Sequence, residues 1–370
     1  MTVLLSALAF FILLTVLVLI HEWGHFIAAR KSGVTVEEFG FGLPPRVKTL
    51  FWKGGTRFSL NWIPFGGFVR LQGENADTEA RRTAPGSFGR ASIPARIVIL
   101  TAGVAMNFLF AILVFTLGFS VGRWTPTYLS IEEMQAAADR GEIQMQLSVL
   151  IDDVISGGGA AQVGVPPTSI LTAIDGQPVR TPADVPPLQA GKKTAKYTVL
   201  TGENFAEEKT IDVPLVEGKS GVSLRSFPRD LQSPQRSFLT AIGLSLREAK
   251  VMTEQTVIGM AKLFTSLART GRVPEGITGI VGIAQLTHAS VQEGFMTYLR
   301  LAALLSLSLA VLNILPLPAL DGGRLLFVLF ELVRRRPANR RFELMTNAIG
   351  FAFLVLLILL ITYHDILRLF

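Results

Sequence analysis

The residues His21-Glu22-Trp23-Gly24-His25 directly follow an apolar run of 18 residues, Val3–Ile20 (VLLSALAFFILLTVLVLI). A helix of that length rises about 27 Å, which is close to the hydrocarbon thickness of a bilayer. The sequence therefore predicts an H-E-x-x-H motif where a membrane-spanning helix approaches one face of the membrane. Ionisable side chains at such a depth are costly unless they have a function.

The spacing within this motif indicates metal chemistry. Residues four apart lie on one side of a helix, so His21 and His25 can bind the same metal ion. Glu22 is then near enough to polarise a water molecule on that metal. The motif needs a third ligand from elsewhere in the chain to form a complete site.

The candidate for the third ligand is Asp321, within the run N-I-L-P-L-P-A-L-D-G-G of residues 313–323. Pro316 and Pro318 cannot continue a regular helix, so we expect the backbone to open there and a new helix to cover about 321–333. An aspartate at the start of a helix is also a favoured N-cap, and that capping role is the alternative.

Two histidines, one carboxylate and an open water position are typical of a catalytic zinc site, whereas a structural site uses four protein ligands. We favour this interpretation for His21, His25 and Asp321. In it, Glu22 takes a proton from the water and passes it to the leaving amine of a peptide.

The composition predicts a membrane protein that carries a soluble portion. Of 370 residues, 49% are hydrophobic and only 17% are charged, and the mean hydropathy is +0.45. Ordinary soluble proteins are less apolar. The chain has no cysteine, which excludes disulfides and cysteine-based metal sites.

Four segments are apolar enough to span a membrane, and they cover about 3–28, 97–122, 299–320 and 346–363. The alternative for the first is a signal peptide, but no basic residue precedes it and its apolar run exceeds the roughly 7–15 residues of a signal core. Lysine and arginine gather between spans one and two, and again between spans three and four.

The positive-inside rule places both of these basic loops in the cytoplasm. Both chain termini and the soluble portion are then outside, and the two halves of the proposed zinc site meet near the cytoplasmic face. A bacterial inner membrane fits this topology best. The net charge of +7 is expected to contact lipid headgroups, and no binding to nucleic acid is expected.

Residues 34–72 contain two stretches with the alternation of β-strands, and Gly54-Gly55 makes a turn between them. The many apolar and aromatic side chains predict a β hairpin that dips into the membrane against protein, where its backbone is shielded from lipid.

The soluble portion is expected at residues 123–236, with short strands at Gln146–Ile151, Ser169–Ile174 and Ala195–Leu200. Residues 238–269 predict one or two amphipathic helices on the outer membrane surface or over the membrane core; packing on the soluble domain is the alternative. The chain is thus expected to divide into four segments: residues 1–122 in the membrane, an outer domain at 123–236, an outer helical segment at 237–296, and residues 297–370 in the membrane.

Four further polar residues need an interpretation, and two of them, both asparagines, have two. Asn107 and Asn313, within spans two and three, either form interhelical hydrogen bonds or hold a substrate backbone beside the metal. The second role is favoured for Asn313, which precedes Asp321 by eight residues. His288 and His364 are expected to be ordinary outer histidines, away from the metal.

Three motifs together resemble the site-2 protease family of intramembrane zinc metalloproteases, and within it the regulator-of-sigma-E type. They are HEWGH at the end of span one, PFGGFVRL at residues 64–71 and NILPLPALDGG at residues 313–323. The resemblance implies zinc ligands at His21, His25 and Asp321 and a catalytic Glu22.

The resemblance also implies a polytopic α-helical membrane fold with four spans, a membrane-reentrant β hairpin at 34–72 that pairs with substrate, and one outer PDZ-like α+β domain at 146–216. The implied substrate contacts are Asn313, Asn107, Gly66 and Gly67. The implied substrates are single-span membrane proteins, such as an anti-sigma factor or a remnant signal peptide, cut after an earlier cut outside. That activity serves stress responses. Binding of the substrate as an added strand of the hairpin is physically reasonable, because a substrate helix must be unwound before its peptide bond can be cut.

This chain departs from the family pattern in two places. Relatives usually have a proline in the span-two motif where this chain has Ala105 or a neighbour. Sigma-E types often have two PDZ domains, but residues 123–236 accommodate one. The domain either binds peptide C-termini or excludes untrimmed substrates by size.

Two other functions are weighed against the protease. A catalytically silent membrane adaptor would be free to lose Glu22, which this chain retains. A zinc transporter would need further histidines or aspartates along a path, and spans two and four supply none.

Overall fold

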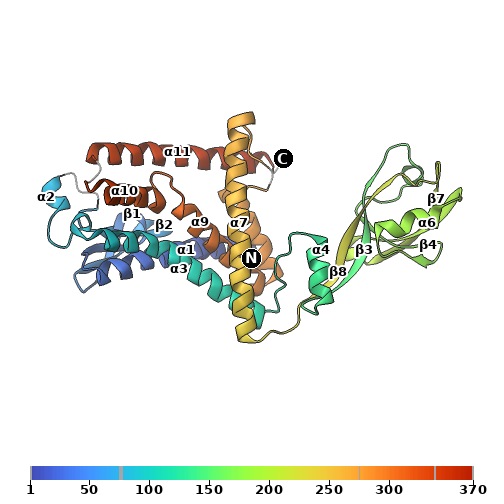
Figure 1. Cartoon of the computed structure of the whole chain (residues 1–370), viewed down its shortest axis with the longest axis horizontal. Helices are drawn as coiled ribbons and strands as arrows, with labels where there is room; N and C mark the ends of the chain where they lie inside the picture. Colours follow the sequence, from blue (N-terminus) through green and yellow to red (C-terminus); the bar gives the residue numbers. More distant parts are fainter. Residues whose placement is uncertain (1, 75–77, 275, 337–338, 369–370) are drawn as a thin grey trace. The chain divides into compact units, whose positions relative to one another are not determined.

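The computed structural model describes residues 2–74, 78–274, 276–336 and 339–368. Among them, four helices are long and apolar enough to cross a membrane, as predicted. These helices are α1 (Thr2–Lys31), α3 (Ile93–Ser120), α9 (Phe295–Ile314) and α11 (Arg340–Leu367) (Figure 1).

The chain forms two compact units. One, here called the membrane unit, comprises Met1–Gly122 and Ser237–Phe370; the other, called the sheet unit, is Arg123–Arg236. The described elements of the membrane unit besides the four spans are β1 (Val36–Lys53), β2 (Thr56–Leu71), α2 (Glu79–Arg82), a 3-10 turn (Phe88–Arg90), α7 (Phe238–Thr270), α8 (Ile280–Glu293) and α10 (Asp321–Arg334).

Helix α3 is the centre of the membrane unit, because α1, α7, α9 and α10 all pack against it. Ser92 caps its start by accepting a hydrogen bond from the backbone N–H of Ala95. Gly24 of α1 lets the two backbones approach: a Cβ there would lie 2.3 Å from the carbonyl oxygen of Ala102. Small residues commonly allow such close helix packing in membranes.

Helix α7 packs on α3 and α9 and runs across the direction of α1 and α11 in Figure 1. The hydroxyls of Thr116 and Ser245 lie 2.9 Å apart, and Arg300 of α9 lies 3.6 Å from the carboxylate of Glu248. The predicted amphipathic segment is therefore one helix, and it belongs to the membrane unit.

Strands β1 and β2 are joined by the predicted turn at Gly54-Gly55, where both glycines have positive φ. Residues 38–41 lie opposite both 57–60 and 67–70, so the two long strands curl into a small sheet. Residues 67–71 form one edge of it, called the edge strand here, and this edge faces α1. The sheet is buried near α1 but exposes its far aromatic side chains, for example Trp62 at 69%.

The sheet unit contains β3 (Gln144–Val154), β4 (Ser169–Ile174), β6 (Thr194–Thr201), β7 (Glu207–Pro214) and β8 (Val222–Gln232), in the order β7-β6-β4-β3-β8, with β5 (Gln177–Pro178) beside β4. All three predicted strands are present. Short helices α4 (Ile131–Asp139), α5 (Gly159–Gln162) and α6 (Val185–Gln189) accompany the sheet. Its core is apolar, with Ile151, Leu171, Ile174, Tyr197 and Val199 fully buried.

Candidate metal centre and active site

Three side chains predicted to bind metal meet in the membrane unit, although Asp321 lies 300 residues from His21 and 296 residues from His25 in sequence. Nε2 of His21 lies 2.9 Å from Oδ2 of Asp321, and Nε2 of His25 lies 3.2 Å from the same oxygen. The two Nε2 atoms are 3.1 Å apart. Both imidazoles are buried and the carboxylate is half-buried. The arrangement concentrates three ligand atoms at one point.

The donor set fits zinc. Ligand atoms at about 2.0–2.1 Å from a tetrahedral Zn²⁺ lie about 3.3 Å apart, close to the separations seen here. Gly103 of α3 stands opposite the imidazoles, where a Cβ would lie 2.4 Å from Nε2 of His25 and 2.8 Å from Nε2 of His21. Only a residue without a side chain leaves room for the imidazoles at this position.

The elements around His25 fix its orientation. Its Nδ1 lies 2.7 Å from the backbone carbonyl oxygen of Ile99 on α3, so Nδ1–H donates and Nε2 is left for a metal. Metal-binding histidines are usually held by such a second hydrogen bond. Nδ1 of His21 is buried and has no hydrogen-bond partner among the described residues.

Asp321 is the first residue of α10, and Leu320 is the N-cap position. Asp321 therefore does not occupy the capping position, and its Oδ2 faces both histidines. Gly322 and Gly323 allow this helix start to pack on the turn after α9, because a Cβ at either would lie 2.2 Å from a backbone carbonyl oxygen. The capping alternative is therefore wrong for Asp321.

Glu22 connects the site to the edge strand. Its Oε2 accepts a hydrogen bond of 2.9 Å from the backbone N–H of Val69. Glu22, His25 and Asp321 line one cavity of about 330 Å³, here called the catalytic cavity, together with residues 68–71. The Glu22 carboxylate, two of the three candidate metal ligands and a strand edge thus line one cavity.

The other predicted site residues lie at different distances from this cavity. Asn313 is half-buried in the last turn of α9, before the turn that leads to Asp321. Asn107 is fully buried on α3, one turn beyond Gly103, and its side-chain amide has no hydrogen-bond partner among the described residues. Their contact with substrate stays a prediction.

Gly66 and Gly67 are buried against α1. Gly66 has a φ of +71°, and a Cβ at Gly67 would lie 2.7 Å from Leu19. Both glycines are therefore required by backbone conformation and packing, and contact with substrate stays a prediction for them too. His288 lies 2.8 Å from the hydroxyl of Ser6, outside the metal cluster.

Sequence reasoning did not identify Gly103, the carbonyl of Ile99, or the ion pair of Glu74 and Arg324 at the cavity wall. A glycine in an apolar span and a backbone carbonyl carry no sequence signal. The ion pair could have been suspected from the sequence, because each motif is followed by a residue of opposite charge. Glu74 follows PFGGFVRL, and Arg324 follows LDGG.

Comparison with known proteins gives one consistent result. The sequence profile described as "Peptidase family M50" matches residues 9–357. The zinc metalloprotease RasP of Oceanobacillus iheyensis is 29% identical over 453 aligned positions, and the alignment covers 99% of each chain. RasP of Bacillus licheniformis is 27% identical, and the regulator of sigma-W protease RasP of Bacillus subtilis is 25% identical, each with 99% coverage of both chains.

Proposed function

Because this chain belongs to peptidase family M50 and is a zinc metalloprotease, we propose that it cuts single-span membrane proteins within the membrane. The observation that carries the proposal is the meeting of His21, His25 and Asp321 within 3.2 Å of one another. That cluster lies between candidate spans and opens into a cavity that also holds Glu22.

His21, His25 and Asp321 would hold the zinc ion. When bound, zinc polarises a scissile carbonyl and lowers the pKa of a bound water to about 7. The Ile99 carbonyl keeps the His25 ring oriented, and Gly103 leaves room for both rings. The protein therefore supplies a preorganised ligand set from two distant parts of its sequence.

Glu22 would act as general base and then as general acid. The carboxylate lines the catalytic cavity and is held by the Val69 N–H, so one oxygen is fixed and the other can face a water. It would receive the proton of the attacking water and deliver it to the leaving amine. A positioned acid–base group typically contributes about 10²–10⁴-fold to rate.

The edge strand would bind the substrate in an extended form. Alternate N–H groups of a strand point to the same side, and the Val69 N–H points at Glu22, so this edge faces the catalytic cavity. An unwound substrate segment added to the edge would present its peptide bond beside Glu22. This supports the predicted pairing of the hairpin with substrate.

The proposed substrate class is supported by the buried site and by the topology expected from the basic loops. Basic loops favour a site near the cytoplasmic face of a bacterial inner membrane, with both termini and the sheet unit outside. Anti-sigma factors and remnant signal peptides, already shortened outside, would suit a buried site. The sheet unit would be PDZ-like and would bind peptide ends or exclude longer substrates.

Replacement of Glu22 by Gln tests this function. Cleavage of a single-span test substrate by purified Glu22→Gln protein should fall by about 10²–10⁴-fold. Zinc content should remain near one ion per chain, because no predicted zinc ligand changes. The matched control is Glu37→Gln, which removes an exposed carboxylate of β1 and should keep full activity.

Two results would contradict the proposal. Cleavage by Glu22→Gln at the wild-type rate would exclude the acid–base role. Wild-type protein without zinc after gentle purification would favour a silent adaptor that captures membrane proteins.

A further inference from the structure

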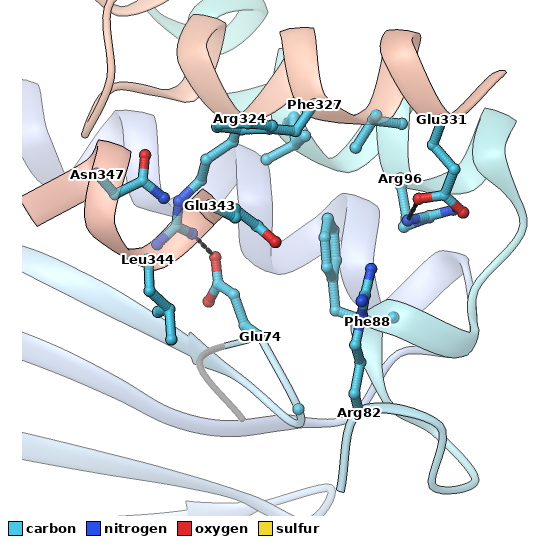
Figure 2. A pocket seen from close by; sticks show the side chains of 14 residues that line it. Glu74, Arg82, Phe88, Arg96, Arg324, Phe327, Glu331, Glu343, Leu344 and Asn347 are labelled. Carbon is cyan, nitrogen blue, oxygen red and sulfur yellow. Dashed lines mark hydrogen bonds and ion pairs between the residues drawn. The ribbon is translucent and has the colours of Figure 1, made fainter. Parts of the chain in front are cut away.

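A second, smaller cavity adjoins the catalytic cavity inside the membrane unit. Its volume is about 40 Å³, which is room for a few water molecules. Helices α3, α10 and α11 and the segment after β2 supply its walls (Figure 2). Six charged side chains line it: Glu74, Arg82, Arg96, Arg324, Glu331 and Glu343. This cavity is called the charged chamber below.

Glu74 and Arg324 line the charged chamber and the catalytic cavity alike. The Arg324 guanidinium donates a hydrogen bond to Oε1 of Glu74, as Figure 2 shows. The side chains are 31% exposed for Arg324 and 14% exposed for Glu74. The ion pair therefore stands in the wall between the two spaces and is largely shielded from solvent.

Each partner is attached to a different half of the candidate site. Arg324 follows Asp321 by three residues on α10, so the two side chains lie on one side of that helix. Glu74 follows the edge strand by three residues, and the Val69 N–H of that strand holds Glu22. The pair thus connects the helix that presents Asp321 to the strand that orients Glu22.

We propose that Glu74 and Arg324 are a positioning pair that sets the distance between Glu22 and the metal-binding carboxylate. Charge-assisted hydrogen bonds with a guanidinium are directional as well as strong. Proton transfer needs hydrogen-bond reach, and a displacement of about 1 Å can cost about 10²-fold in rate. The inference rests on the proposed function, because it assigns the pair a role in that same site.

A neighbouring ion pair provides a matched comparison. Arg96 of α3 forms two hydrogen bonds, of 2.7 and 2.9 Å, with the carboxylate of Glu331 on α10 (Figure 2). This pair also lines the charged chamber and also holds α10, but it does not line the catalytic cavity. It is expected to contribute to stability without affecting the position of Glu22.

The test compares Glu74→Gln, Arg324→Gln, the double variant and Glu331→Gln in the full-length zinc-loaded protein. Each single variant of the positioning pair should lower kcat by about 10- to 100-fold and leave KM within about 3-fold. The double variant should be no worse than the more damaged single variant, because the residues act as a unit. Arg324→Lys should recover part of kcat. Glu331→Gln should lower the melting temperature and keep kcat within about 2-fold of wild type.

A second measurement does not depend on turnover. Hydrogen–deuterium exchange of the peptide covering residues 67–74 should become faster in Glu74→Gln and Arg324→Gln and remain unchanged in Glu331→Gln. Wild-type kcat and unchanged exchange in the pair variants would overturn the inference. The inference would also be overturned if the pair variants lost zinc and melted at a clearly lower temperature together with the fall in kcat. That result would show that the pair only stabilises the fold.

Inclusion of Glu22→Gln separates the two proposals. If Glu22→Gln is inactive and the pair variants turn over normally, the function stands and the positioning role is wrong. If Glu22→Gln remains active, the acid–base function is wrong, and the positioning role toward Glu22 is overturned with it whatever the exchange shows.

Discussion

The membrane unit and the sheet unit distribute their polar residues in opposite ways. In the sheet unit, the buried polar side chains among the described residues are uncharged: Ser169, Gln189, Thr201, Ser220 and Ser233. Its ion pairs lie at the surface, for example Lys192 with Asp175, where the side chains are 42% and 35% exposed. This unit is a conventional apolar core with a charged exterior.

The membrane unit exposes many large apolar side chains and buries several ionisable ones. Leu109 and Phe351 are 60% and 64% exposed, whereas His21, His25, Arg96 and Glu248 are buried, as are Glu38 and Asp365. Asp365 accepts hydrogen bonds from the backbone N–H groups of Gly279 and Gly282, so it joins α11 to the start of α8. Buried charges are costly unless they are paired or bind metal. In this unit, a buried polar group therefore indicates a connection between elements or a functional site.

Gly103→Ala should give the largest effect that tests this contrast. The new Cβ would lie 2.4 Å from Nε2 of His25 and 2.8 Å from Nε2 of His21, so the imidazoles must move. Disturbance of ligand orientation typically costs about 10- to 100-fold in metal affinity. Competition with a chromophoric zinc chelator measures this loss, and activity should fall with it.

The matched control is Gly243→Ala in α7, where a Cβ meets no atom within 4 Å. Alanine is the better helix former by about 1 kcal/mol, so this variant should be as stable as wild type or slightly more so. If Gly103→Ala kept wild-type zinc affinity, the imidazoles would not require the space opposite them, and the fit of the site to zinc would be weakened.

Much of this arrangement was predictable from sequence. The H-E-x-x-H spacing predicted that His21 and His25 lie together, and the basic loops led us to expect Asp321 at the same membrane face; the structure places Asp321 within 3.2 Å of both histidines. The positions of the four spans and of the strands followed from hydropathy and alternation, because each depends on residues close in sequence.

The remainder depends on tertiary contacts. The curl of β1 and β2 places residues 38–41 opposite two separate segments of β2, a register that no local pattern specifies. The need for Gly103 arises only when α3 packs on α1. Pairing of Arg96 with Glu331 joins residues 235 positions apart, so in the sequence Arg96 resembles an ordinary loop residue and Glu331 an ordinary surface residue of a helix.

Breaking the Arg96–Glu331 pair should have the next largest effect, this time on stability. Arg96 is 5% exposed and Glu331 is 18% exposed, so Arg96→Met leaves a mostly buried carboxylate unpaired. Loss of one partner of such a pair costs about 3–5 kcal/mol. The melting temperature in detergent should fall clearly, and Lys192→Met at the exposed pair of the sheet unit should change stability by less than about 1 kcal/mol. Equal losses in the two variants would remove the contrast between the units.

The pH dependence of the same pair provides a finer test. The hydrogen bond from Arg96 holds the pKa of Glu331 below its ordinary value of 4.5. A depressed carboxyl pKa stabilises the folded state above the unfolded pKa, and this contribution is lost as pH falls through the folded pKa. The stability difference between wild type and Glu331→Gln should therefore be constant from pH 8 to about pH 5 and shrink below about pH 4.5. A difference that shrinks already near pH 7 would exclude this ion pair as its source.

The smallest expected effect is that of Asp175→Asn in the sheet unit. The hydrogen bond from Lys192, followed by that from the Lys196 backbone N–H, holds the pKa of Asp175 below its ordinary value of 3.8. Asparagine tolerates the positive φ of 50° at this position, so the substitution removes charge without adding backbone strain. Because the pair is exposed and screened, the loss at pH 7 should stay well under about 1 kcal/mol and vanish in 1 M salt. The loss should also shrink as the pH falls below about 3.8, the ordinary pKa, and vanish once the pH has passed through the lower folded pKa, where the wild-type carboxyl becomes neutral. A loss that persisted in high salt would mean that the sheet unit, like the membrane unit, depends on charges shielded from solvent.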